Sequence, residues 1–256
     1  MRKSEKPGST PNYIGSALIF VGLFAIYGII TGAKLADPVI FPNLLKVLKA
    51  GVKSAHLLGR GCLFSLRLLA PAFTLAVILG IGLGTFIALH DKLKALVMPV
   101  VYALNPIPPT MLIPYAIAIF PTFWLSSASI ICLGVFWPVL RATINGIAFL
   151  EPRWIDNARC LNLSGAKLVF KIILPGAMPS IFAGIESGLI LSFILLTVGE
   201  IFGARAGLGF FIQYYADFAE YDRVVAGIIA LSLVVSALMV IFGRVKARTL
   251  FWTKKR

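Results

Sequence analysis

The stretch ALVMPVVYALNPIPPTMLIPYAIAIFPTFWLSSASIICLGVFWPVL, residues 95–140, contains no Asp, Glu, Lys or Arg. A helix that crosses the hydrocarbon core of a bilayer needs about 20 apolar residues, so this stretch is long enough for two. Outward from it, the chain is also uncharged over residues 7–33, 68–89, 172–185 and 224–243. The whole chain is 59% hydrophobic and only 13% charged. Such runs leave almost no polar face for a soluble helix, and the pattern predicts an all-α integral membrane protein.

The uncharged runs predict about six transmembrane helices within a membrane domain of residues 14–244. The expected spans are 14–31, 68–89, 96–120, 123–144, 178–203 and 224–242. Short basic tails, 1–13 and 245–256, flank this domain. A basic start before an apolar stretch is also typical of a cleaved signal peptide. The stretch is long for that purpose and no clear cleavage pattern precedes Lys34, so we expect the first helix to be retained.

Basic residues indicate the orientation. Six spans place both termini on one side, and cytoplasmic termini put most of the 24 Lys and Arg residues inside, as the positive-inside rule requires. This explains the net charge of +14 without a nucleic-acid partner. The remaining basic residues include those of segment 34–67, which is then external. There, Leu44, Leu45, Val47 and Leu48 alternate with lysines and predict an amphipathic helix on the outer lipid surface.

The three cysteines, Cys62, Cys132 and Cys160, are far apart in the sequence, as are the two histidines, His56 and His90. These positions show neither a disulfide framework nor the spacing of a metal site. We therefore expect no metal.

Small residues and prolines mark the interior of the predicted spans. Gly80 with Gly84, and Gly184 with Gly188, are spaced to let helices approach closely. Prolines interrupt the span at 96–120, most densely in Asn105-Pro106-Ile107-Pro108-Pro109. Broken backbone at membrane depth is tolerated where it is buried in protein or faces a watery cavity. Pro106 and Pro108 are therefore candidates for the wall of a translocation pathway, with a simple kink as the alternative.

Glu186 and Glu200 are the only carboxylates within the predicted spans. Acidic residues in such positions face the bundle interior or a wet cavity, which makes both of them pathway candidates. Structural roles are the alternative. Glu186 would then pair with Arg141 at the inner end of the fourth span, and Glu200 would extend to the outer interface.

The longest polar interruption between spans begins near residue 146, and it predicts a cytoplasmic helical hairpin at about 146–175. Its first part reads EPRWIDNARCLNLSG, residues 151–165. Pro152 suits a first helical position, and Trp154, Ala158 and Leu161 recur at helical spacing on one face. Ser164-Gly165 then predicts a break, followed by a second helix at 166–174 that stops at Pro175. The hairpin is either a docking knob for a protein partner or a helix pair lying on lipid headgroups.

This segment resembles the signature loop of ABC importer permeases, in which Glu-Ala-Ala is followed by Gly and then Leu-Pro. Asp156-Asn157-Ala158 takes the first place, and Ile173-Leu174-Pro175 closes the motif. The flanks resemble the family too, in PGAMPSIFAG (175–184), Gly199-Glu200, GLG (207–209) and FWP (136–138). The resemblance covers about residues 60–245 and is closest to permeases of the nitrate, sulfonate and taurine group.

The resemblance implies a permease subunit of an ABC importer in a bacterial inner membrane. The hairpin would be a coupling helix that docks into a separate ATPase subunit. Implied partners are two ATPase copies, an external solute-binding protein, a second permease copy and membrane lipid. The chain has no G-x-x-x-x-G-K-[ST] loop, so ATP is expected on the partner, and no cofactor on this chain. The implied coupling residues are Asp156, Asn157, Ala158, Leu161, Asn162, Gly165 and Pro175.

One departure from the family pattern falls at Asn162, where glycine is usual. Asn tolerates the left-handed backbone conformation better than most residues, so we expect the turn to be kept. Two other functions remain open on the residues alone: an ion-coupled secondary transporter that uses Glu186 and Glu200, and a membrane scaffold that transports nothing. The transported solute does not follow from the sequence.

Overall fold

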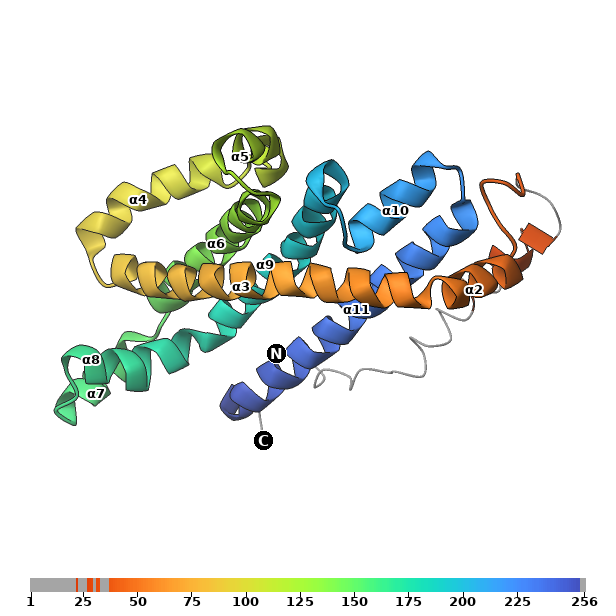
Figure 1. Ribbon diagram of the computed structural model, residues 1–256. Helices are drawn as coiled ribbons and strands as arrows, with labels where there is room; N and C mark the ends of the chain where they lie inside the picture. The colour runs from red at the N-terminus through yellow and green to blue at the C-terminus, as the bar shows by residue number, and fades with distance from the viewer. Residues whose placement is uncertain (1–21, 23–26, 30, 33–36, 254–256) are drawn as a thin grey trace.

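In the computed structural model, the described residues are 22, 27–29, 31–32 and 37–253. The predicted first span falls mostly outside them, as do the N-terminal tail and the last three residues. The described elements are helical (Figure 1). Their bounds are α2 Leu44–Lys53, α3 Ala55–Ala88, α4 Asp91–Leu104, η1 Pro109–Leu112, α5 Ile113–Ile119, α6 Phe123–Ala148, α7 Pro152–Cys160, α8 Gly165–Leu168, η2 Val169–Ile173, α9 Leu174–Gly203, α10 Leu208–Asp217, α11 Tyr221–Thr249 and η3 Phe251–Thr253.

Four described helices are long and apolar enough to cross a membrane, namely α3, α6, the continuous helix Gly165–Gly203 and α11. Helix α4 and the segment Pro109–Ile119 pass the same criterion together, but they are bent by 83° at the break between them. If that pair is one span, the described part of the chain has five. The prolines at 105–109 thus break the third predicted span, as expected from the missing backbone donors.

Helix α6 lies between α3 and α9, and glycines set both contacts. A Cβ at Gly80 would lie 2.8 Å from the Val139 side chain, and one at Gly84 would lie 2.8 Å from Thr143. On the other side, a Cβ at Gly184 would overlap the Ala142 methyl group. The predicted close approach at both glycine pairs is confirmed, because Gly188 likewise packs on Val135 of α6.

Two predicted boundaries are wrong. The second span was expected to begin at residue 68, but α3 begins at Ala55 and continues unbroken for 34 residues. Its first turns pack against the region after α9, where Gly61 lies against Gly207. Only α2 therefore remains as the separate amphipathic helix predicted within segment 34–67. The helix after the hairpin was expected to stop at Pro175, but it runs on into α9.

Pro175 lies within the continuous helix Gly165–Gly203, where its missing N–H group removes one backbone hydrogen bond. The π-helical turn η2 immediately precedes it, and the Leu174 N–H group bonds the Val169 carbonyl. A π-turn inserted in a helix commonly marks a functional position. Here it joins the hairpin to the longest helical rod of the described chain.

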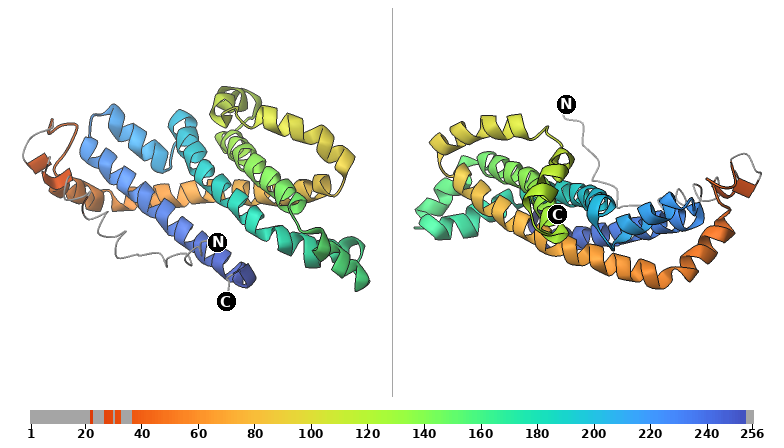
Figure 2. Two further views of the ribbon diagram at one scale, coloured as in Figure 1. Left: turned by 180° about the vertical axis from the view of Figure 1, so that it is seen from behind. Right: turned by 45° about the horizontal axis from the view of Figure 1, so that its top comes forward.

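Helices α7 and α8 project from one end of the α6–α9 pair, opposite the end that carries α5 and α10 (Figures 1 and 2). This end also receives the C-terminal part of α11. The two ends therefore carry different elements, the helical hairpin at one and the loop from α9 to α10 at the other.

Candidate functional site

Helix α7 has well-defined ends. Pro152 occupies its first turn after Glu151, and Glu151 pairs with the Arg153 guanidinium at 2.5 Å. Both side chains are exposed, so this pair adds little stability. At the other end, Asn162 has φ 56°, the Asn162 N–H group bonds the Arg159 carbonyl, and the Leu163 N–H group bonds the Ala158 carbonyl. These two bonds define a Schellman cap, whose left-handed position Asn162 occupies. Asn162 thus keeps the turn, as expected.

Gly165 begins α8 with φ 54°, and a Cβ at this position would meet no atom within 4 Å. The positive φ therefore explains a glycine here, and crowding does not. Asn162 and Gly165 together provide two left-handed residues in the turn between α7 and α8, and they set the direction in which α8 returns to the bundle.

One face of α7 is held by the bundle. Ala158 is only 3% exposed, and the Trp154 ring lies against Gly176, where a Cβ would be 3.2 Å from the ring. A cavity of about 450 Å³ separates α7 from the start of α9. Ala158 and Pro175 line it, together with Trp252 from the C-terminal segment.

Several side chains of α7 remain accessible at the surface. Asp156 and Asn157 are exposed, and Leu161 is 75% exposed despite its apolar side chain. The predicted apolar stripe is kept, because Trp154, Ala158 and Leu161 line the same cavity, and Leu161 at its end is largely exposed. Asp156, Asn157 and Leu161 are therefore accessible at this end of the molecule.

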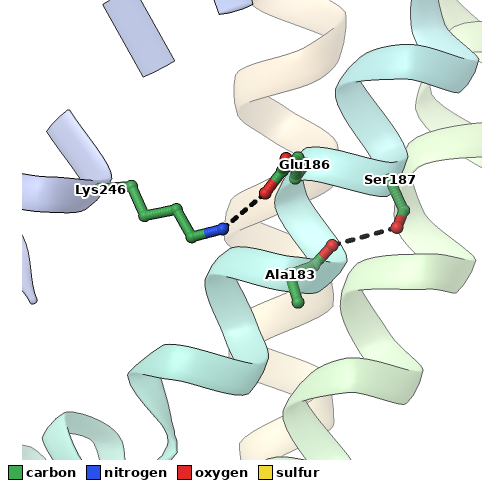
Figure 3. A network of polar contacts seen from close by, with 4 residues as sticks. All are labelled: Ala183, Glu186, Ser187 and Lys246. Carbon is green, nitrogen blue, oxygen red and sulfur yellow. Dashed lines mark hydrogen bonds and ion pairs between the residues drawn. The ribbon is translucent and has the colours of Figure 1, made fainter. Parts of the chain in front are cut away.

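Glu186 pairs with Lys246 across α9 and α11, and the expected pairing with Arg141 is wrong. The Lys246 Nζ atom donates to the Glu186 carboxylate at 2.6 Å (Figure 3). The two side chains are 39% and 35% exposed. Lys246 reaches Glu186 because its long aliphatic stem carries the charge away from α11. Beside the pair, Ser187 bonds the Ala183 carbonyl of its own helix.

Glu200 is buried instead of extending to the interface, since it is 1% exposed. Its carboxylate accepts a hydrogen bond from the Ser65 hydroxyl at 2.6 Å and another from the Gly209 N–H group at 2.7 Å. Ser65 in turn accepts from the Leu208 N–H group at 3.1 Å. Leu208 and Gly209 are the first residues of α10, so Glu200 and Ser65 cap that helix and its positive N-terminal end.

The remaining predicted residues lie elsewhere. Pro106 and Pro108 are exposed at the break between α4 and η1. Among the described residues, no group of three His, Cys, Asp or Glu side chains is placed to hold a metal ion.

Sequence reasoning missed two partners, Ser65 and Lys246. Lys246 was assigned to the basic tail, although an acidic residue inside a span calls for a cation on a neighbouring helix. Ser65 carried no signal of its own, because a single hydroxyl within an apolar helix has many local uses.

The chain belongs to the family described as binding-protein-dependent transport system inner membrane component, which it matches over residues 76–250. Members are the membrane subunits of ABC importers. The chain is therefore an ABC transporter permease.

Several curated relatives cover most of the chain. The aliphatic sulfonates transport permease protein SsuC of Bacillus subtilis, itself described as putative, is 28% identical over 90% of this chain and 84% of its own length. The taurine transport permease TauC of Escherichia coli is 30% identical over 66% of this chain and 62% of its own length. The nitrate import permease NrtB of Synechocystis is 26% identical over 91% of this chain and 89% of its own length.

The fold is similar to that of solved ABC transporters. A chain of the MetNI methionine transporter in an inward-facing conformation superposes with a TM-score of 0.64. It is 19% identical in sequence, and the match covers 77% of this chain and 98% of that one. At this identity the likeness describes the fold alone.

Proposed function

We propose that this chain forms the translocation pathway of an importer for a small oxyanion, and that its α7–α8 hairpin couples the pathway to a separate ATPase. The observation that carries the coupling role is the hairpin itself. Ala158 and the Trp154 ring contact the bundle, while the side chains of Leu161, Asp156 and Asn157 are exposed. Its position at the end of the bundle suits contact with a protein outside the membrane.

A mechanical connection supports this role. The hairpin continues through η2 into α9 as one helical rod, Gly165–Gly203. Helix α9 is in turn closely packed on α6 through Gly184 and Gly188. Movement of α7 by an ATPase would therefore displace two spans together, and Glu186 would transmit part of that displacement to α11 through Lys246.

The proposed substrate class follows from the relatives. Their names refer to taurine, aliphatic sulfonates, nitrate and bicarbonate. These solutes share a small planar or tetrahedral oxyanion group. We assign this chain to the same class without choosing among the members.

The proposed assembly has two permease copies, two ATPase subunits that carry the ATP, and an external solute-binding protein. It lies in the bacterial inner membrane with both termini of the permease and the hairpin in the cytoplasm. Pro106 and Pro108, at the 83° bend, then contribute to the pathway wall.

The coupling role is tested by Leu161→Glu. The side chain is largely exposed, so the change alters the docking surface with little effect on the fold. In proteoliposomes with the ATPase and binding protein, we expect ATP-driven uptake to fall about tenfold or more, with an unchanged melting midpoint for the permease alone. The matched control is Leu45→Glu on α2, which is 67% exposed and lies away from the hairpin. Normal uptake by Leu161→Glu would contradict the coupling role.

The secondary transporter makes a different prediction, namely uptake by this chain alone in a proton gradient. Glu186 and Glu200, which it would use, have separate partners on different helices, Lys246 on α11 and Ser65 on α3. Solute uptake without the ATPase would favour that alternative, and no flux with any partner would favour the scaffold.

A further inference from the structure

A second cavity lies at the end of α9 that is opposite the hairpin. It has a volume of about 270 Å³ and is enclosed by the start of α3, the loop 204–207 and helix α10. The lining includes two arginines, Arg60 from α3 and Arg205 from the loop. Aromatic rings from α10 form the remaining wall, contributed by Phe210, Phe211, Tyr214 and Tyr215.

The two walls meet through a glycine contact. A Cβ at Gly61 would lie 3.1 Å from the Gly207 carbonyl oxygen, so α3 approaches the loop as closely as backbone allows. Gly207 has φ 125°, which favours glycine. Arg60 and Arg205 lie beside these two glycines, on separate elements whose spacing the contact fixes.

The cavity carries positive charge without a matching carboxylate. No acidic side chain lines it, and neither Arg60 nor Arg205 forms an ion pair with any of the described residues. The Glu200 carboxylate lies against Gly207 but does not line the cavity, and both of its oxygens are engaged, by Ser65 and by the Gly209 N–H group. Two guanidinium groups without acidic partners present planar donor sets suited to an oxyanion.

Tyr215 provides an independent observation. It lines the cavity and is only 8% exposed, yet its hydroxyl has no hydrogen-bond partner within the described part of the chain. Its ring is covered by the Arg223 guanidinium at 4.6 Å from the ring centre. A phenol that is held in place in this way can donate its proton to an anion in the cavity.

We propose that this cavity binds a small oxyanion group, a sulfonate, carboxylate or phosphate, between the guanidinium groups of Arg60 and Arg205, with the Tyr215 hydroxyl as a further donor. Its external location rests on the proposed function, because the cytoplasmic hairpin is at the other end of α9. The site then receives the anion on the side from which an importer takes its solute. The same chemistry would also hold the phosphate of a lipid headgroup.

The test uses the full chain in nanodiscs of pure phosphatidylcholine, with trifluoromethanesulfonate as the probe and its ¹⁹F NMR line width as the readout. We expect saturable broadening for the native chain. Arg60→Gln with Arg205→Gln should weaken apparent affinity by about tenfold or more, because two charge-assisted hydrogen-bond donors are lost. The matched control is Lys46→Gln with Lys49→Gln, which removes the same charge from exposed positions on α2 outside the cavity.

A milder variant guards against misfolding. Tyr215→Phe keeps the ring under Arg223 and removes only the hydroxyl. It should weaken the apparent affinity for the probe by a few-fold. Equal broadening for the native chain and the double arginine variant would overturn the proposal, as would equal weakening by the lysine control.

A second lipid composition distinguishes the sources of the anion. If phosphatidylglycerol in the nanodisc suppresses probe broadening of the native chain, the site takes a lipid phosphate, and unchanged broadening assigns it to a soluble anion. The outcome of this binding test is independent of the outcome of the uptake test for the proposed function. Absent ATP-driven uptake would reject the importer and leave the arginine-dependent binding intact, whereas normal uptake with arginine-independent broadening would reject only this site.

Discussion

Glu200 shows how a single charge is placed at membrane depth. A carboxylate removed from water is costly unless its oxygens receive hydrogen bonds. Here both oxygens have a donor, one from Ser65 of α3 and one from the Gly209 N–H group of α10. The residue therefore joins three helices that are distant in sequence, and its position at the start of α10 adds a favourable interaction with the helix dipole.

Removing this carboxylate should destabilise the bundle. Glu200→Ala leaves the Gly209 donor and the Ser65 hydroxyl without their acceptor, and we expect a loss of about 2–3 kcal/mol in stability. Glu200→Gln keeps one acceptor oxygen and should lose less. The measurement is the melting midpoint of the purified chain in detergent. Asp217→Asn is the control, because Asp217 is exposed. Equal midpoints for Glu200→Ala and the control would contradict this role.

Asn162 determines how α7 ends. Its φ of 56° is a conformation that a β-branched residue adopts only with strain. We expect Asn162→Val to destabilise the turn by about 1–2 kcal/mol and Asn162→Gly to leave it unchanged or slightly more stable. Hydrogen exchange of the α7 amides should report this directly, with faster exchange in the valine variant. If both variants exchange alike, the Schellman cap does not control the hairpin.

At the scale of elements, α6 and α9 form a unit because glycines remove the space between them. Gly184→Val would place a branched side chain against Ala142 and the Pro138 carbonyl. Overpacking of this kind typically costs about 1–3 kcal/mol, so we expect a clearly lower melting midpoint. Gly82→Val is the matched control, because a Cβ at Gly82 meets no atom within 4 Å. A similar loss in both variants would indicate a general effect of valine in these helices.

The C-terminal half of α11 contacts α9 through an ion pair and a ring contact. Lys246 meets Glu186, and Phe242 meets Phe182 with ring centres 5.9 Å apart. Glu186→Lys alone should lower both stability and ATP-driven uptake, by about 1 kcal/mol in the former, because it places like charges side by side. Adding Lys246→Glu restores an opposite-charge pair and should recover uptake. Failure of the double variant to recover would show that the pair does not join α11 to α9 during transport.

Much of this arrangement could be predicted from hydropathy and spacing, and the failures have physical causes. Uncharged runs identify spans because the bilayer core excludes charge. They do not locate helix ends where a helix leaves the membrane and packs on protein, as α3 does before residue 68. Pro175 predicted a stop, but the helix continues through this proline directly after the π-helical turn η2. The Glu186 partner was missed because Lys246 was assigned to the basic tail, whereas α11 continues to Thr249 and brings Lys246 beside α9.

At the scale of the molecule, α9 connects two sites of opposite character. The α7–α8 hairpin lies at one end, and helix α10 lies at the other (Figure 1). Leu161 is exposed on the hairpin, and α10 lines the cavity that contains the two arginines. The proposed coupling to an ATPase requires these two ends to lie on opposite sides of the membrane. The chain supplies its own probe of this arrangement, since Cys160 is exposed at the end of α7, whereas Cys62 and Cys132 are partly buried in the helices.

The orientation is therefore testable with a membrane-impermeant maleimide and vesicles of known sidedness, in the absence of the ATPase. In a Cys62→Ser, Cys132→Ser background, we expect Cys160 to react in inverted vesicles and to be protected in right-side-out vesicles. Moving the thiol to the other end, with Cys160→Ser and Arg205→Cys, should reverse the pattern, because Arg205 is exposed beyond the last residue of α9. Reaction of both thiols from the same side would contradict a membrane-crossing α9, and with it the path from hairpin to cavity.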